Sequence, residues 1–166
     1  MALVVEDGTG VTGANTYISE TEYTTWANDR FGSARSTLPA DTAAYEAIIK
    51  RAMDYLETLE FKGIKKERDQ ALQWPRYDVY IDGYYVDSDS IPQELKNAVF
   101  ELTYAEETNV GEFAQVSRET KREKVGPVEV EYSDSAASRT ISPSISATLR
   151  KLVAGGSGSS FSVSRA

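Results

Sequence analysis

Residues 41–63 of the chain read DTAAYEAIIKRAMDYLETLEFKG. Their apolar side chains recur at spacings of three and four residues, which places them on one face of a helix of about five turns. Asp41 favours an N-cap at its start, and Gly63 favours the residue that follows its last turn. Such a helix must bury its apolar face, so we expect the rest of the chain to pack around it. The apolar positions are Tyr45, Ile48, Ile49, Ala52, Met53, Leu56 and Leu59.

Three other segments have the same helical periodicity. The first spans residues 20–31, behind a capping box of Ser19 and Glu22. The second spans residues 92–107, and the third is a short helix that begins at Pro143. The sequence therefore predicts a mainly α fold, a small bundle of about four helices in which each apolar stripe covers another.

A β-hairpin is predicted between the second and third of these four helices. Residues 77–85 hold four of the ten tyrosines, and Asp82-Gly83 lies between two β-prone triplets. Asp-Gly favours the type I′ turn, which needs positive φ at both central positions. Pro75 makes the preceding segment rigid and non-helical. A two-stranded ribbon alone is marginally stable, so we expect the insertion at 74–89 to lie on the body or on another subunit.

The hairpin and the C-terminal end supply candidate interface residues. Tyr, Trp and Arg are the side chains that interfaces favour. Residues 155–166 are rich in Gly and Ser, which predicts a flexible tail after a helical domain of residues 1–154. Apolar residues alternate with serines in this tail, a pattern suited to adding a strand to another protein. The candidates are Trp74, Arg76, Tyr80, Tyr84 and Tyr85 in the hairpin, and Phe161, Val163 and Arg165 in the tail.

A second extended segment is predicted at residues 123–134, EKVGPVEVEYSD, because its apolar residues alternate from Val128 onward. Pro127 at its beginning fits an edge strand. A single strand needs a partner strand, and the sequence is compatible with three candidates: residues 3–5, the hairpin or a neighbouring chain.

The composition excludes several kinds of chemistry. The chain has no cysteine and no histidine, which rules out disulfides, thiolate metal sites and every Ser-His-Asp or Cys-His arrangement. Residues 8–13 hold three glycines, but Asn15 and Thr16 stand where a phosphate-binding loop would need its lysine, so we expect a flexible loop. No apolar run approaches the length of about 20 residues that crosses a bilayer. We expect no enzyme, no cofactor, no metal and no membrane partner.

The charge balance is acidic, with 18 basic and 26 acidic side chains and a net charge of −8. Such a balance repels nucleic acid at long range. Lys62, Lys65, Lys66 and Arg68 form a basic cluster, but acidic residues interrupt it. A solvated loop or a rim contact with a partner is therefore favoured there over a nucleic-acid contact.

Several sequence blocks, in this order, resemble head-to-tail connector, or adaptor, subunits of tailed bacteriophages. Many such proteins carry the label "DnaT-like single-stranded DNA-binding protein". The resemblance extends from about residue 8 to residue 155, and the blocks at 71–76 and 91–98 are the most distinctive. The blocks are GTGVTGANTYIS (8–19), RAMDYLETLEFKG (51–63), ALQWPR (71–76), IPQELKNAVFELT (91–103), EKVGPVEVEY (123–132) and SISATLRKL (144–152).

The resemblance implies a structural role in the virion, after synthesis in the cytoplasm of the bacterial host. Connector subunits form a ring, usually dodecameric, beneath the portal at the capsid vertex, and the ring extends the DNA channel. Their partners are further copies of the same chain, the portal protein, and tail-proximal neck or tail-terminator proteins. Double-stranded DNA passes through without specific binding, which an acidic subunit suits.

The alternative is a DnaT-like replication accessory protein that binds single-stranded DNA. Aromatic side chains of the hairpin would stack on bases beside a basic track. The acidic balance counts against this alternative, so the sequence places the connector hypothesis first. The stacking candidates are Trp74, Tyr77, Tyr80, Tyr84 and Tyr85, and the basic candidates are Lys62, Lys65, Lys66, Arg68 and Arg76.

Overall fold

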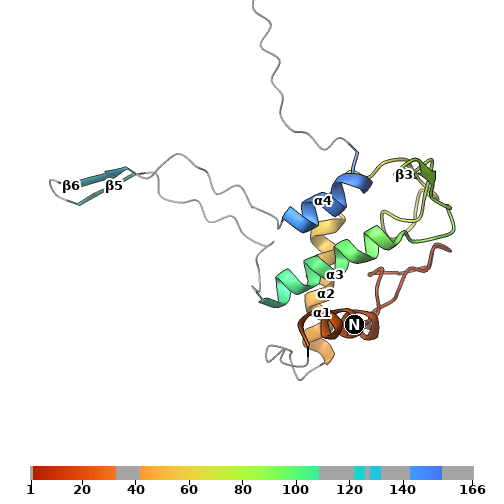
Figure 1. Cartoon of the computed structure of the whole chain (residues 1–166), viewed down its shortest axis with the longest axis horizontal. Coiled ribbons are helices and arrows are strands. Elements are labelled where there is room, and N and C mark those ends of the chain that lie inside the picture. The colour runs from red at the N-terminus through yellow and green to blue at the C-terminus, as the bar shows by residue number, and fades with distance from the viewer. Residues whose placement is uncertain (1, 33–41, 109–121, 126–127, 132–142, 155–166) are drawn as a thin grey trace, which may run out of the picture.

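The structure, a computed structural model, describes residues 2–32, 42–108, 122–125, 128–131 and 143–154. The helices in these ranges are α1 (Glu20–Phe31), α2 (Thr42–Leu56), α3 (Gln93–Thr108) and α4 (Pro143–Leu152). The strands are β1 (Ile64–Lys65), β2 (Arg76–Tyr77), β3 (Tyr80–Ile81), β4 (Tyr84–Tyr85), β5 (Arg122–Val125) and β6 (Val128–Glu131). The fold is mainly α with inserted β-hairpins, as predicted (Figure 1).

Helix α3 is central to the helical part, because α1, α2 and α4 each pack against it (Figure 1). Six of the seven apolar positions predicted for the organising helix are buried, and Leu59 is half-buried. Burying one large apolar side chain contributes about 1.5–3 kcal/mol, so this shared interior is the main source of stability. None of the described helices is long and apolar enough to cross a membrane. Residues at the centre include Ile49, Ala52, Leu56, Leu95, Ala98, Val99, Leu102, Ile145, Leu149 and Leu152.

The start of α1 forms the predicted capping box. The Ser19 hydroxyl accepts the N–H of Glu22 at 3.1 Å, and the Glu22 carboxylate accepts the N–H of Ser19 at 2.7 Å. Lys96 of α3 donates to the other Glu22 oxygen at 2.9 Å, which ties the two helices together. Trp26 is buried and stacks on Phe100 with ring centroids 5.4 Å apart.

Helix α2 is shorter than predicted, because it ends at Leu56 and not beside Gly63. After the helix, Thr58 and Leu59 donate their N–H groups to carbonyls three residues back, a tightening typical of a last turn. Gly63 does have positive φ, at 73°. It is required for another reason: a Cβ there would lie 2.1 Å from the carbonyl oxygen of Tyr77. The glycine serves a strand pair and not a helix end.

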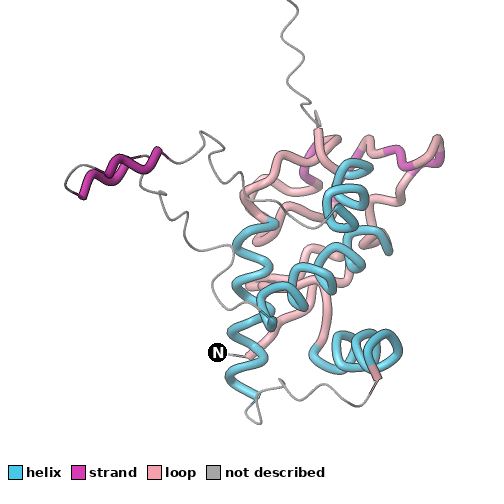
Figure 2. The backbone as a smooth tube through the Cα atoms, turned by 60° about the vertical axis from the view of Figure 1, so that its left-hand side comes forward, coloured by secondary structure: helices cyan, strands magenta, loops and turns pink. Residues whose placement is uncertain are grey.

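Two short hairpins follow one another between α2 and α3 (Figure 2). In the predicted one, β3 pairs with β4, and the turn residues Asp82 and Gly83 have φ of 52° and 88°. The other pair, β1 with β2, was not predicted. Each of its strands has two residues, too few for an alternating pattern to be visible in the sequence.

The prediction of one extended segment that needs a partner elsewhere is wrong, because the segment forms two strands, β5 and β6. They pair with each other in antiparallel fashion, with Arg122 opposite Glu131 and Val125 opposite Val128. Gly126-Pro127 separates them in the sequence. We interpreted this dipeptide as the start of a strand, but Gly-Pro is itself a turn signal.

The N-terminal glycine loop is held by one buried carboxylate and is not the flexible loop that we expected. Glu6 is only 1% exposed, and its two oxygens accept the N–H groups of Gly8, Gly10 and Val11 at 2.8–2.9 Å. A Cβ on Gly8 would meet the carbonyl oxygen of Asp89 at 2.2 Å. The loop is therefore folded around Glu6 and seated against the segment that follows β4.

We expect Glu6→Gln to lower the free energy of unfolding by about 1–3 kcal/mol. The substitution replaces one carboxylate oxygen by an NH2 group, which faces backbone N–H donors and cannot accept their hydrogen bonds. Urea denaturation followed by circular dichroism measures the change. Asp7→Asn is the matched control, because Asp7 is exposed and accepts hydrogen bonds from Thr9 of the same loop. Equal denaturation midpoints for Glu6→Gln and the wild type would contradict the role of Glu6.

Candidate functional site

The candidate site is the tyrosine hairpin, by which we mean residues 80–85 of β3, β4 and their turn, together with Tyr77 of β2. Large side chains that are exposed in the described part of the chain gather here: Tyr84 is 81% exposed, Tyr80 59%, Tyr85 51% and Tyr77 41%. Tyr80 and Tyr85 are cross-strand partners, and their rings meet edge to face at 5.6 Å. Exposed aromatic rings of this kind are available to a partner, whether a base or a protein side chain.

Val79 and Ile81 anchor the tyrosine hairpin to the helical body, since both are buried in the core cluster. Val86 continues the pairing with an N–H that donates to the Val79 carbonyl at 2.9 Å. The hairpin thus has apolar residues inward and tyrosines outward. Tyr80, Tyr84 and Tyr85 are therefore exposed, as an interface residue has to be, and their role in an interface stays a prediction.

Trp74 and Arg76, which we also proposed as interface residues, lie inside the subunit. Trp74 is fully buried, and its ring meets Phe61 edge to face at 6.2 Å. Arg76 is 8% exposed. Neither side chain is available in this structure for stacking on a base or for contacting a phosphate, which removes one aromatic and one basic residue from the predicted track.

The Arg76 guanidinium donates its hydrogen bonds mostly to backbone carbonyls. Its Nε donates to the Lys62 carbonyl at 2.7 Å, and Nη2 donates to the carbonyls of Gly63 at 2.8 Å and Phe61 at 3.2 Å. Nη1 donates to the carbonyl and to the side-chain oxygen of Gln73. Arg76 therefore fixes the loop before β1 onto β2, a positioning role that no local sequence signal reveals.

Tyr17, which is buried, and Glu57, which is half-buried, support the segment that leads into β2. The Tyr17 hydroxyl donates to Glu57 at 2.8 Å and accepts the N–H of Trp74 at 3.0 Å. The second Glu57 oxygen accepts the N–H of Gln73 at 2.8 Å. Burial raises the pKa of Glu57, and burial together with the Glu57 charge raises the pKa of Tyr17. No local sequence pattern predicts this network, because its members lie far apart along the chain.

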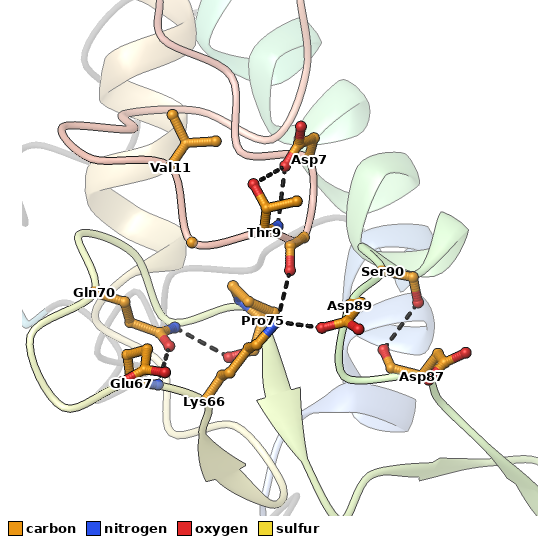
Figure 3. Close-up of polar contacts among 12 residues, drawn as sticks. Asp7, Thr9, Val11, Lys66, Glu67, Gln70, Pro75, Asp87, Asp89 and Ser90 are labelled. Carbon is orange, nitrogen blue, oxygen red and sulfur yellow. Dashed lines mark hydrogen bonds and ion pairs between the residues drawn. The ribbon is translucent and has the colours of Figure 1, made fainter.

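Two lysines form ion pairs with carboxylates in or just after the hairpin. Lys151, at the end of α4, donates to Asp82 of the hairpin turn at 2.6 Å. Lys66, which follows β1, donates to Asp89, which follows β4 (Figure 3). Each carboxylate raises the pKa of its lysine through this hydrogen bond. Lys62 donates to the Lys151 carbonyl at 2.7 Å and so joins the same surface.

The charge around the tyrosine hairpin is close to balanced. Residues 62–89 hold five basic and six acidic side chains, a net charge of −1, whereas the whole chain carries −8. Within the described residues, no cluster of acidic side chains has the grouping that could hold a metal ion. The tail candidates Phe161, Val163 and Arg165 lie outside the described residues.

Comparison with known protein families gives one match. A family model described as "Putative DnaT-like ssDNA binding protein" matches residues 1–166. The chain belongs to this family. Searches of curated proteins and of solved structures gave no match. The family description agrees with the single-stranded DNA hypothesis better than with the connector hypothesis that the sequence placed first.

We expect Trp74→Ala to destabilise the isolated subunit by about 3–5 kcal/mol, because it leaves a cavity in the core. Tyr84→Ala removes an exposed ring of the same ribbon and should change stability by no more than about 0.5 kcal/mol. Thermal and urea denaturation of both variants make the comparison. A Trp74→Ala variant as stable as the wild type would show that Trp74 does not serve the core.

Proposed function

We propose that this protein is a binding protein and not an enzyme, and that single-stranded DNA is its ligand. The observation that carries the proposal is the exposure of three tyrosines on the β3–β4 ribbon and of a fourth on the adjoining β2, in a chain whose residues 1–166 match a family described as binding single-stranded DNA. Bases stack on aromatic rings whatever their sequence, because every base has a π-face. The expected binding is therefore independent of sequence.

The basic side chains near the ribbon add a limited electrostatic contribution. Lys65 lies in β1 next to the exposed Ile64, and Arg68 is exposed in the loop that follows. Each phosphate contact on single-stranded nucleic acid contributes about −0.7 to the slope of log K against log salt. With a local net charge of −1, we expect a shallow salt dependence and an affinity that comes mostly from stacking.

The test is fluorescence anisotropy of a labelled oligothymidylate, titrated with the protein at several salt concentrations. Tyr84→Ala should weaken binding about 5- to 150-fold, because stacking contributes about 1–3 kcal/mol per base. Tyr84→Phe keeps the ring and should bind like the wild type. Equal affinities of Tyr84→Ala and the wild type would place the DNA elsewhere, and no binding at low salt would overturn the proposal.

A second candidate function, the head-to-tail connector, is favoured by the charges beside the tyrosines. Asp78 and Asp87 flank the ribbon, Asp82 lies in its turn, and these carboxylates repel phosphate. In addition, Arg76 is buried and two lysines are ion-paired. Exposed tyrosines among balanced charges also suit a protein partner. In this role the chain would form a ring with further copies, bind the portal and neck proteins in the virion, and let double-stranded DNA pass.

Light scattering of the purified protein, alone and mixed with a portal protein, followed by imaging of any complex, tests this second candidate. A connector should form a ring coaxial with the portal and show almost no salt-dependent DNA binding. A monomer that ignores the portal and binds single-stranded DNA would contradict the connector role and support the first proposal.

A further inference from the structure

The tyrosine hairpin has a lysine–carboxylate pair at each of its two ends. At the turn, Asp82 pairs with Lys151 of α4. At the base, Asp89 pairs with Lys66. Tyr84 and Tyr85 lie between Asp82 and Asp89 along the chain, and Tyr80 is the cross-strand partner of Tyr85. A ligand that follows the ribbon from its turn toward Asp89 would therefore meet a lysine at each end.

Both carboxylates are on the surface, since the side chains of Asp82 and Asp89 are 62% and 72% exposed. Ion pairs in water gain little, because solvent screens the charges and each side chain loses freedom. Exchange of such a carboxylate for another anion therefore costs little. A phosphate oxygen offers a lysine the same charge-assisted hydrogen bond as the carboxylate that it replaces.

The lysines are positioned by contacts other than their carboxylates. The N–H of Lys66 donates to the Pro75 carbonyl at 3.1 Å, and its Nζ also reaches the Gly8 carbonyl at 3.4 Å (Figure 3). Lys151 lies in the last turn of α4, and its carbonyl accepts a hydrogen bond from Lys62. Removing a carboxylate thus leaves each lysine on the same surface with its charge uncompensated.

We propose that Asp82 and Asp89 occupy the positions of DNA phosphates, so that single-stranded DNA binds the ribbon by replacing both carboxylates on Lys151 and Lys66. This inference rests on the proposed function and deepens it, because it names the phosphate contacts that accompany stacking. In the free protein the two aspartates weaken the binding of DNA by competing for the lysines. These two ion pairs explain how an acidic chain holds two lysine side chains in position to bind phosphate.

A double-mutant cycle on oligothymidylate binding tests the exchange. Asp82→Asn should strengthen binding about threefold, since Lys151 no longer has a competing partner. Lys151→Gln should weaken binding and reduce the salt slope by about 0.7, the contribution of one phosphate. In the Lys151→Gln background, Asp82→Asn should gain nothing. The same cycle with Asp89→Asn and Lys66→Gln examines the other end.

Asp78→Asn and Asp87→Asn are matched controls, because both aspartates are exposed, lie in the same segment and form no ion pair among the described residues. They remove the same charge without releasing a lysine, so any gain they show measures the general effect of charge. A gain for Asp82→Asn no larger than for Asp78→Asn, or one that persists beside Lys151→Gln, would overturn the exchange while leaving DNA binding intact. A wild-type protein that binds no single-stranded DNA would overturn the proposed function as well.

Discussion

The position of the tyrosine hairpin depends on one buried guanidinium. Arg76 binds the carbonyls of residues 61–63 and of Gln73, which come shortly before β1 and shortly before β2 in the segment between α2 and β2. The same loop pairs with the end of α4, since Lys62 donates to the Leu152 carbonyl and Ala154 donates to the Glu60 carbonyl. A planar side chain with five N–H donors can satisfy this many acceptors, which a lysine could not do.

The helices could be predicted from the sequence because their causes are local. The apolar spacing, the capping box at Ser19 and the proline that begins α4 all act within a few residues, and α1 has the predicted bounds. Gly63 and Arg76 were misinterpreted because their causes are distant. Gly63 is required because the carbonyl of Tyr77 lies close to it. Arg76 is buried by a loop that is well separated from it in the sequence.

The candidate site was predictable in part, for a similar reason. The Asp82-Gly83 turn signal fixed which tyrosines form a ribbon, and their exposure follows from the burial of Val79 and Ile81 beneath them. The pairing of Lys151 with Asp82 joins residues that only the packed structure brings together. Residue type alone does not distinguish a base from a protein partner, because tyrosine rings serve both. The description of the matching family names single-stranded DNA, which is the reason for testing that ligand first.

The burial of Trp26 and Trp74 has an optical consequence. These are the two tryptophans of the chain, and both are enclosed by the core while the ribbon carries tyrosines. Indole emission should therefore report the integrity of the helical body and respond little to a ligand on the ribbon. Loss of the native fold and occupancy of the surface can be followed independently in one cuvette, the first by tryptophan emission and the second by a label on the ligand.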